Sequence, residues 1–351
     1  MSNQTSRSML SLPMKLALIG AAGAAAAYTA RQRRRMDFAG KTVVITGGSR
    51  GLGLELARAF ANEGANIALL ARDREQLAEA EREIRRTGVR VVTMSCDVTR
   101  QDEVQNAVAA VTSELGIDVL VNNAGIIQVG PFEHMELNDF ADAMNAHFWG
   151  SLHLIHAVVP QMKRQGGGRI INIASIGGKI AVPHMLPYVA SKFALVGLSE
   201  GLRAELAKDH IYVTTVSPGL MRTGSHVNAF FKGQHKKEFA LFSIANASPA
   251  LSVSSARAAR QIIEACRYGV AQLVISPQAR MARLLNGVVP TFVGGALSLI
   301  GWLLPAPARS DGDHARRGWQ SRSVLAPPLL TGPADRATSR NRERLQPAPS
   351  E

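Results

Sequence analysis

The chain has 351 residues, 46% of them hydrophobic, and a formal charge of +13, so one α/β domain with extensions at its ends is the expected size class. Its two cysteines, Cys96 and Cys266, are too few and too widely separated for a disulfide framework, and they indicate small buried side chains in a reducing compartment. No Cys/His cluster has metal-ligand spacing, which excludes a metalloenzyme.

The first 36 residues are basic and partly apolar. They contain six Lys or Arg and no acidic residue, and the uncharged run Leu16–Ala27 precedes the arginines of segment 31–35. This run is shorter than the ~20 residues that span a bilayer. It suits a signal peptide or a membrane anchor. Because the arginines oppose translocation, we expect an anchor with the domain on the cytoplasmic side, or a plain cytoplasmic location.

The next segment has the order strand, glycine turn, helix. Thr42–Ile45 is β-branched and apolar, as in a buried parallel strand, and residues 54–62 keep apolar side chains at helical spacing. Glycines between them let the backbone approach a pyrophosphate at the start of a helix, although an ordinary glycine-rich turn has the same composition. The candidate dinucleotide contacts of this turn are Gly47, Ser49, Arg50, Gly51, Leu52 and Gly53.

Strand-like and helix-like segments alternate through the rest of the domain. Helical stretches, such as residues 74–87 with their Glu/Arg surface pattern, separate further predicted strands at 66–71, 90–96, 119–122, 169–174, 212–216 and 272–275. This alternation predicts an α/β fold with a doubly wound parallel sheet.

Cofactor choice depends on the end of the second predicted strand, which runs into Arg72 and Asp73. NAD-binding members of such folds place an acidic residue here for the ribose 2′-hydroxyl, whereas a guanidinium suits the 2′-phosphate of NADP. Because Arg72 comes first and Arg50 lies in the glycine turn, we predict NADP(H) over NAD(H). Asp73 is the alternative partner for a 2′-hydroxyl, and both arginines also suit ordinary surface charges.

Three side chains in the second half of the domain form a candidate proton-transfer site. Tyr188 and Lys192 are four residues apart and therefore share one face of a helix. A phenol has a reference pKa of about 10, so an ammonium beside it is needed to bring its pKa toward neutrality. Ser175 lies thirteen residues before Tyr188, where a predicted strand ends, and is placed to hydrogen-bond the same substrate oxygen.

Taken together, these motifs resemble the short-chain dehydrogenase/reductase family. The likeness extends from about Phe38 to Ser276 and comprises Thr46-Gly-x-x-x-Gly51-x-Gly53, Asp97-Val98, Asn122-Asn123-Ala124-Gly125, Ser175, Tyr188-x-x-x-Lys192 and Ser217-Pro218-Gly219 with Thr223 beyond. Each motif is weak alone, and the ordered set is specific. The resemblance implies a Rossmann fold of seven strands, a site at their carboxyl ends, and a homo-oligomer.

The resemblance also implies residue roles in a hydride transfer between the nicotinamide and a carbonyl or CH–OH carbon. Tyr188 is then the acid/base, Ser175 orients the carbonyl, and Lys192 lowers the pKa of Tyr188 and holds the nicotinamide ribose. The other implied cofactor contacts are Asp97 and Val98 at the adenine, Asn123 near the adenosine ribose, and Pro218, Gly219 and Thr223 at the nicotinamide.

One position departs from the family pattern. The family's fourth catalytic residue is an Asn that supports a water in the proton relay, and counting back from Gly150 places His147 there. Asn145 lies about 200° away around a helix and should face elsewhere. A neutral imidazole both donates and accepts hydrogen bonds, so His147 suits the relay, and simple packing or capping is the alternative.

The segment after the Pro-Gly turn usually covers the substrate in this family. Residues 220–249, called the lid segment below, include Phe230, Phe231, Phe239, Leu241, Phe242 and Ile244, and Val182, Met185 and Leu186 precede Tyr188. We expect an apolar pocket for a hydrophobic, lipid-like ketone or alcohol. Packing within the lid, or a dimer surface, is the alternative.

Two segments follow the domain. Residues 281–304 contain the uncharged run Leu284–Leu304, which suits a membrane span, or an apolar helix pair packed on the domain or on a membrane surface. Residues 305–351 are rich in Pro, Arg, Ser and Asp and are expected to be disordered. Because the basic excess lies beside apolar ends and no nucleic-acid module is visible, we expect contact with a membrane surface and none with nucleic acid.

We therefore expect residues 37–280 to form an oxidoreductase domain that prefers NADP(H). Two alternatives are a non-catalytic cofactor-binding scaffold at a membrane, and an epimerase or dehydratase of the same fold. The intact Ser175, Tyr188 and Lys192 argue against the scaffold. The lack of a large C-terminal substrate domain argues against the epimerase or dehydratase.

Overall fold

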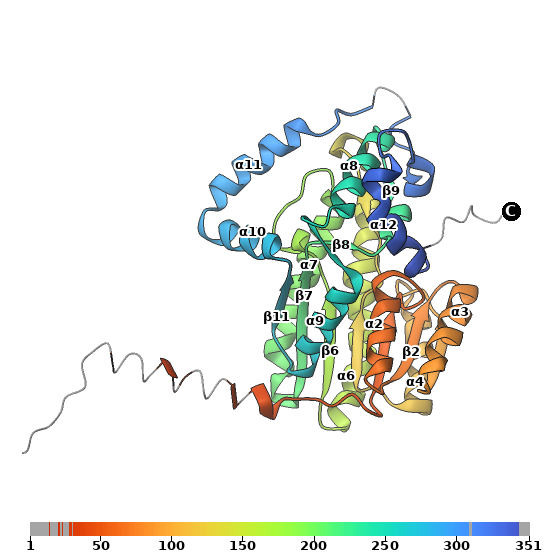
Figure 1. Cartoon of the computed structure of the whole chain (residues 1–351). Coiled ribbons are helices and arrows are strands. Elements are labelled where there is room, and N and C mark those ends of the chain that lie inside the picture. Colours follow the sequence, from red (N-terminus) through yellow and green to blue (C-terminus); the bar gives the residue numbers. More distant parts are fainter. Residues whose placement is uncertain are drawn as a thin grey trace, which may run out of the picture.

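A computed structural model describes residues 14, 20, 21, 23, 28, 29, 31–308 and 311–343. Its centre is a parallel sheet of seven strands in the order β11-β7-β6-β4-β1-β2-β3 (Figure 1). The strands are β1 (Thr42–Thr46), β2 (Asn66–Ala71), β3 (Val91–Ser95), β4 (Val119–Asn122), β6 (Gly168–Ile173), β7 (Ile211–Pro218) and β11 (Gln272–Ile275). The predicted doubly wound sheet is confirmed, and every predicted strand is present with its ends displaced by two residues at most.

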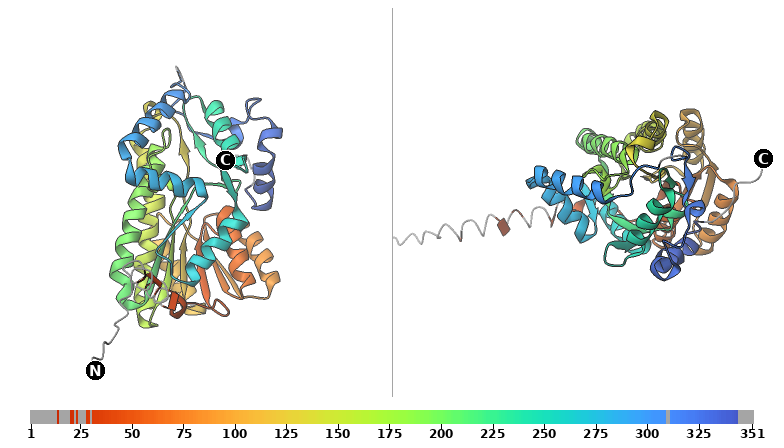
Figure 2. Two further views of the ribbon diagram at one scale, coloured as in Figure 1. Left: turned by 60° about the vertical axis from the view of Figure 1, so that its left-hand side comes forward. Right: turned by 90° about the horizontal axis from the view of Figure 1, so that it is seen from above.

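Helices cover both faces of the sheet (Figures 1 and 2). Val43 and Ile45 of β1 face one hydrophobic core, whereas Val44 between them faces the other. Both faces of the strand are thus buried, which explains its unbroken apolar sequence. The helices of the first core are α2 (Gly51–Asn62), α3 (Arg74–Ile84) and α9 (Ser255–Arg267), and those of the second are α4 (Gln101–Leu115), α6 (Gly150–Arg164) and α7 (Leu186–Leu206).

Strand order reverses beside β1, with β2 on one side and β4 on the other. In open α/β sheets the crevice at such a reversal, outside the carboxyl ends of the strands, is where ligands bind. The glycine turn after β1 and Ser175 after β6 both lie at this edge. The topology therefore brings together two motifs that are far apart in the sequence.

Smaller elements lie over this edge. Two minor sheets are formed by β8 (Leu220–Arg222) with β10 (Ser252–Ser254), and by β12 (Arg316–Arg317), β9 (Phe230–Phe231) and β5 (Gln128–Val129). Helix α8 (His235–Ala247) belongs to the lid segment, and α5 (Leu137–Met144) leads through a π-helix at Asn145–Trp149 into α6. Short 3₁₀ turns occupy residues 85–87, 132–134, 176–178, 207–209, 225–227 and 318–321.

The uncharged run near residue 290 forms two helices, α10 (Pro277–Val288) and α11 (Pro290–Leu303). Pro290 disfavours helical geometry at Val289 before it and starts the second helix, so the chain turns at this point. Within the described residues, no helix has both the length and the apolarity needed to cross a membrane. The run is thus two helices and not one continuous helix, which is the arrangement of the helix-pair alternative.

The expectation of a disordered tail from residue 305 is wrong for residues 311–343. This segment adds β12 to the lid, turns at 318–321 and ends in α12 (Pro328–Arg340), which packs against α8 (Figure 1). Ala334 of α12 is fully buried, and the arginines that gave the tail its polar composition form ion pairs with the domain. Composition alone misleads here because these charges are satisfied by partners elsewhere in the chain.

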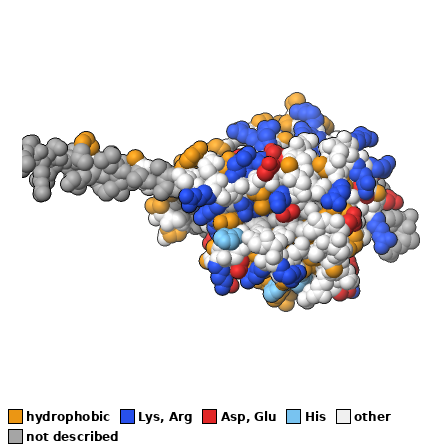
Figure 3. All heavy atoms as spheres, turned by 90° about the horizontal axis from the view of Figure 1, so that it is seen from below, with side chains coloured by type: hydrophobic (Ala, Val, Ile, Leu, Met, Phe, Trp, Pro, Cys, Tyr) orange, Lys and Arg blue, Asp and Glu red, His pale blue; other side chains and the backbone are white. Residues whose placement is uncertain are grey.

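The N-terminal arginines reach the end of the sheet opposite the lid. Arg31 stacks on the ring of Tyr268 with its guanidinium carbon 4.3 Å from the ring centroid, and Arg34 lies 5.1 Å from the centroid of Tyr212. On this end of the molecule Lys and Arg side chains outnumber acidic ones (Figure 3). The predicted anchor run Leu16–Ala27 lies mostly outside the described residues.

Candidate active site

Ser175 and Tyr188 meet at the carboxyl end of β6. Ser175 follows the strand, and its Oγ accepts a hydrogen bond from the Gly177 amide at 3.0 Å, which starts the turn at 176–178. Tyr188 lies in the first turn of α7, and a Cβ on Gly177 would lie 3.5 Å from both Ser175 Oγ and Tyr188 Cε1. The two side chains predicted to share a substrate oxygen are therefore neighbours.

Lys192 lies one turn further along α7 and is buried, with its Nζ 5.6 Å from the centroid of the Tyr188 ring. Nζ donates to the Ile173 carbonyl at 2.8 Å. Burial lowers the pKa of Lys192 to about 7. Burial also raises the pKa of Tyr188, against the opposing hydrogen bond from Ser175. The expected lowering of the Tyr188 pKa by Lys192 is thus absent, because the ammonium is itself disfavoured by burial and is turned toward a backbone carbonyl.

His147 lies in the π-helix and is 1% exposed. Its Nε2 accepts from the Ile126 amide at 3.2 Å, so its Nδ1 carries the proton and donates to Ser191 Oγ at 2.7 Å. Its ring also meets the Tyr188 ring edge-on, with centroids 5.4 Å apart. Desolvation holds the His147 pKa well below its usual value, so the imidazole is neutral. Asn145 is exposed, as its helical position predicts.

The glycine turn packs tightly against the strand β4. Side-chain Nδ2 of Asn123 donates to the Thr46 carbonyl at 2.9 Å, and Thr46 Oγ1 accepts from the Asn123 amide at the same distance. A Cβ on Gly53 would lie 2.2 Å from the Gly47 carbonyl oxygen, so only glycine lets α2 begin this close to the turn. Gly47 and Gly51 have positive φ angles of 61°, which glycine adopts without strain.

The residues predicted around the adenosine lie at the ends of β2 and β3. Arg72 is mostly exposed and lies 3.8 Å from the Asp97 carboxylate, whose other oxygen accepts from the Thr99 amide at 3.0 Å. Asp73 caps α3 by accepting from the Gln76 amide at 3.0 Å. Two further predicted contacts, Ser49 and Val98, are buried beside this region. Leu52 is buried in the first turn of α2.

On the nicotinamide side, β7 runs through Pro218, and the Gly219 amide donates to the Ile275 carbonyl at 3.1 Å. Thr223 is buried and bonds Ser225 Oγ at 2.9 Å. Its carbonyl accepts from Asn341 Nδ2 at 2.9 Å. The sequence reasoning missed Asn341, and also Glu343 beside the glycine turn, because no local pattern marks a tail residue that returns to the site.

The aromatic residues of the lid segment mostly pack together. Phe231 is fully buried and Phe239 nearly so, and their rings meet edge-on with centroids 5.5 Å apart. Met185 and Ala326 pack against this cluster. For Phe231 and Phe239 the packing alternative is therefore correct, while Leu186 and Leu241 remain exposed.

A parallel sheet with a glycine turn at the start of a helix defines a Rossmann-type dinucleotide-binding protein. The sequence profile of the family described as short chain dehydrogenase matches residues 41–232, more than half of the chain. The chain belongs to the short-chain dehydrogenase/reductase family, as its motifs indicated. It is an oxidoreductase of a family that uses nicotinamide cofactors.

Relatives with assigned activities are about a third identical to this chain over the residues that align. A 3-oxoacyl-[acyl-carrier-protein] reductase of Staphylococcus epidermidis is 37% identical over 183 residues, which are 52% of this chain and 75% of that protein. The gluconate 5-dehydrogenase of Gluconobacter oxydans is 34% identical over 188 residues, 53% of this chain and 73% of the relative.

Solved structures of similar fold include enzymes with each nicotinamide cofactor. The L-sorbose reductase of Gluconobacter frateurii, in complex with NADPH and L-sorbose, aligns with a TM-score of 0.62 and 30% identity over 69% of this chain and 97% of its own. A xylitol dehydrogenase bound to NAD+ aligns with a TM-score of 0.61 and 30% identity over 68% of this chain and 99% of its own. The neighbours thus support a nicotinamide cofactor and leave open which of the two.

Proposed function

We propose that this protein is an NADP(H)-preferring oxidoreductase that acts on a carbonyl or a secondary alcohol, with Tyr188 as its acid/base. The observation that carries this proposal is the position of Tyr188 beside Ser175 at the carboxyl end of β6, where a Cβ on Gly177 would lie 3.5 Å from Ser175 Oγ and from Tyr188 Cε1. A carbonyl oxygen placed between these two hydroxyls would accept a hydrogen bond from both.

The protein's own groups suit the proton-transfer half of the reaction. Because burial raises the Tyr188 pKa, the phenol is protonated at neutral pH, the form that donates to a carbonyl oxygen during reduction. In the oxidation direction the same hydroxyl accepts the proton. Ser175 holds the carbonyl oxygen in place. A bound nicotinamide supplies or accepts the hydride.

His147 is better suited to positioning than to the relay itself. Both ring nitrogens are bonded to protein groups, Ile126 and Ser191, and Ser191 Oγ in turn donates to the Tyr188 carbonyl at 2.8 Å. These hydrogen bonds connect the middle of the π-helix to the backbone of Tyr188. We infer that His147 holds the first turn of α7 in place.

The glycine turn fits a dinucleotide, and arginines favour a 2′-phosphate. The close packing at Gly47 and Gly53, where a side chain would meet neighbouring protein atoms, lets the turn bring backbone amides to the start of α2, which suits a pyrophosphate. Desolvation lowers the pKa of Arg317, and the charges of Arg50 and Arg72 lower it further, so both cations act on Arg317 electrostatically. Asp73, the alternative partner for a 2′-hydroxyl, is engaged as a helix cap. These observations support NADP(H).

The test is oxidation of NADPH and NADH across a panel from short aldehydes to 3-ketoacyl chains and sterols. We expect Tyr188→Phe to abolish turnover, by about a thousandfold or more, while NADPH affinity changes little. The matched control is Tyr268→Phe, at the far end of the sheet, which should keep full activity. Arg72→Ala should raise the KM for NADPH and leave that for NADH unchanged, whereas Arg86→Ala should change neither.

Retained turnover in Tyr188→Phe would contradict the assigned acid/base. NADPH binding without turnover of any substrate would favour the non-catalytic scaffold, and consumption of NADPH in equal amounts with a ketone would exclude both alternatives. Equal cofactor preference in wild type and Arg72→Ala would remove the arginine argument.

We further propose that the substrate is hydrophobic and reaches the site from a membrane surface. Helix α10 contacts the loop before Tyr188, where Asn286 Nδ2 donates to the Lys179 carbonyl at 3.2 Å, and α11 passes Pro183. The pair exposes the large apolar side chains of Leu284, Val288, Phe292, Leu299, Trp302 and Leu303. Helix α10 itself carries two basic residues, Arg280 and Arg283. An apolar face beside basic residues suits anionic lipid.

Vesicle sedimentation tests this contact. We expect the full chain to bind phosphatidylglycerol vesicles more than phosphatidylcholine vesicles. Since burying a large apolar side chain contributes about 1.5–3 kcal/mol, the double variant Phe292→Ser, Trp302→Ser should bind roughly tenfold more weakly or worse. Leu137→Ser, which alters a residue 88% exposed on α5, is the control. Binding of the double variant equal to wild type would show that the helix pair is not the contact.

A further inference from the structure

The end of the described chain returns to the glycine turn. We call residues 328–343 the strap; it consists of α12 and the three residues after it. The strap packs against α8 and reaches Gly51, the first residue of α2 (Figure 1). It passes so close to Gly224 that a Cβ there would lie 2.6 Å from the Thr338 Cα.

Two residues of the strap occupy the start of α2. The Gly51 amide donates to the Asn341 carbonyl at 2.9 Å. The Glu343 carboxylate lies 3.5 Å from Arg50 Nε and accepts from Asn228 Nδ2 at 2.6 Å, and one of its oxygens lies 2.6 Å from where a Gly51 side chain would begin. A carboxylate and a backbone carbonyl thus lie at the position where this fold receives a phosphate.

Asn341 also contacts the nicotinamide side of the site. Asn341 Nδ2 donates to the Thr223 carbonyl at 2.9 Å and to Ser255 Oγ at 3.2 Å, and Asn341 is fully buried. Arg50, Gly51 and Thr223 were all predicted to contact the cofactor. The strap therefore connects the glycine turn to the nicotinamide side.

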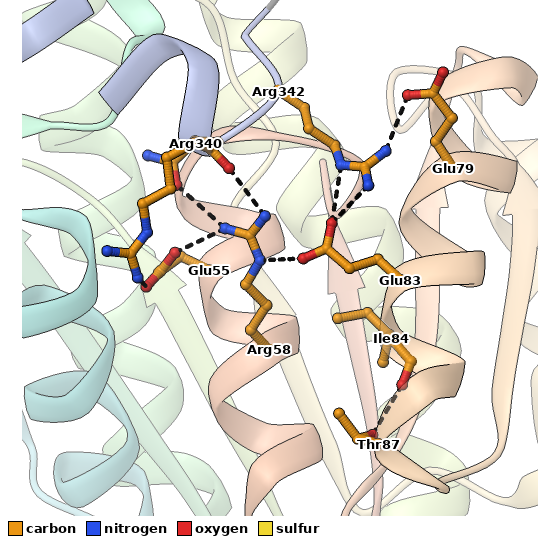
Figure 4. Close-up of polar contacts among 9 residues, drawn as sticks. Glu55, Arg58, Glu79, Glu83, Ile84, Thr87, Arg340 and Arg342 are labelled. Carbon is orange, nitrogen blue, oxygen red and sulfur yellow. Dashed lines mark hydrogen bonds and ion pairs between the residues drawn. The ribbon is translucent and has the colours of Figure 1, made fainter. Parts of the chain in front are cut away.

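Ion pairs outside the crevice hold the strap in place (Figure 4). Arg340 pairs with Glu55 at 2.9 Å, and Arg58 donates to the Arg340 carbonyl at the same distance. Arg342 pairs with Glu79 at 3.0 Å and with Glu83 at 2.7 Å. These contacts join the strap to α2 and α3, the helices that follow β1 and β2.

A carboxylate and a diphosphate compete for such a position. The amide at the start of α2 already has the Asn341 carbonyl as its acceptor, so a diphosphate would have to replace that carbonyl. The Glu343 carboxylate would also repel a diphosphate, because both are anions. Glu343 is 5% exposed, and burial raises its pKa while Arg50 and Asn228 act in the opposite direction. Arg50 and Asn228 are thus the groups that compensate its charge, and Arg50 was the predicted partner of a phosphate.

We propose that the strap is an intramolecular competitor of the dinucleotide, and that Asn341 and Glu343 must leave the glycine turn before the cofactor binds. This inference rests on the proposed nicotinamide site. Its consequence is regulation: the apparent Kd for the cofactor equals the intrinsic Kd divided by the fraction of molecules with the strap released. A change that weakens the strap should therefore tighten cofactor binding.

The experiment is NADPH titration of the full-length chain, followed by NADPH fluorescence. Glu343→Gln removes the competing charge while keeping an acceptor for Asn228, and Arg342→Met removes the ion pairs with Glu79 and Glu83. We expect both variants to bind NADPH about tenfold more tightly than wild type, as follows if the closed state is favoured about tenfold. Arg336→Met, an exposed change of the same kind on α12, is the control and should match wild type.

A second readout is amide hydrogen exchange of residues 334–343. Exchange should rise when NADPH is added to wild type, because the strap is displaced. Unchanged or weaker NADPH binding in both variants, or greater protection of the strap on adding NADPH, would overturn the proposal and make the strap a passive or closing element. Absence of NADPH and NADH binding in every variant would instead overturn the proposed cofactor site, and the strap proposal with it.

Discussion

The two sides of the crevice are held in different ways. Around Tyr188, the supporting groups His147, Ser191 and Lys192 are at most 4% exposed and are bonded to one another or to the backbone of neighbouring elements. Around the glycine turn, Asn341 and Glu343 are buried, but the strap that carries them is held by ion pairs in which Arg342 is 27% and Arg340 61% exposed. Buried, fully bonded groups fix geometry, whereas partly exposed ion pairs each contribute little and separate easily. The proton-transfer side is therefore pre-arranged, and the cofactor side is adjustable.

The largest effect on stability is expected at His147. In His147→Ala, the Ile126 amide and Ser191 hydroxyl lose their buried partner and a cavity opens beside Tyr188, which should destabilise the fold by roughly 2–4 kcal/mol. Urea unfolding measures this loss. His147→Asn retains a donor and an acceptor and should cost less. His156→Ala, at an exposed position on α6, should have almost no effect. If His147→Ala lost no more free energy of unfolding than His156→Ala, His147 would not be what holds the residues around Tyr188 in place.

A pH-dependent effect is expected at Lys192. Its folded pKa of about 7 is below the unfolded value, so the unfolded chain binds more protons between pH 7 and about 10 and the wild type gains stability as pH rises. The gain is about 1.4 kcal/mol per pH unit at most. Below pH 7 both states carry the proton, and this contribution to the slope vanishes.

The comparison variant is Lys192→Met, which lacks this titration. The free energy of unfolding is measured with urea at pH 6.5, 8 and 9.5. As the pH rises, it should increase for wild type relative to Lys192→Met. An exposed lysine variant, Lys237→Met, should show the same pH dependence as wild type. Parallel curves for wild type and Lys192→Met would mean that Lys192 keeps its proton at high pH, against its burial.

The smallest effect is expected at Arg58, which joins the strap to the domain. Its guanidinium bonds Glu83 at 2.6 Å and Glu55 at 3.0 Å. Burial alone would raise the pKa of Glu83, but Arg58 and Arg342 hold that pKa below its usual value. The ion pairs of Glu83 therefore stabilise the fold at neutral pH, and this stabilisation is lost as the pH falls below about 4. Arg58→Met should cost about 1 kcal/mol in low salt and less in 1 M NaCl. If Arg58→Met lost as much free energy of unfolding as His147→Ala, and lost it equally at low and high salt, the strap would be held as firmly as the residues around Tyr188.

Several parts of the fold followed directly from the sequence. The strands Asn66–Ala71, Val119–Asn122 and Gln272–Ile275 were predicted with the ends that the structure has. Short apolar runs bounded by charged or turn residues, with helical stretches between them, are a local signal that tertiary contacts do not alter. The same holds for the turn glycines, since their positive φ angles and close contacts are requirements of the local backbone.

Other features depended on partners that no local pattern identifies. Lys192 was expected to lower the pKa of Tyr188 because helical spacing places the two on one face, but spacing gives neither burial nor the direction of Nζ, which turns to the Ile173 carbonyl. Likewise, His147 could be placed by counting from Gly150, whereas its partners Ile126 and Ser191 belong to other elements.

The sequence by itself determined the α/β class, the position of the glycine turn, and the membership of Ser175, Tyr188 and Lys192 in one family motif, because each rests on residues close together in the chain. Only the tertiary structure decided that Pro290 divides an apolar run into two helices lying on the domain, and that residues 311–343 are folded. The tail's composition is polar because its charges pair with Glu55, Glu79 and Glu83, and such pairing is invisible until the chain has folded back on itself.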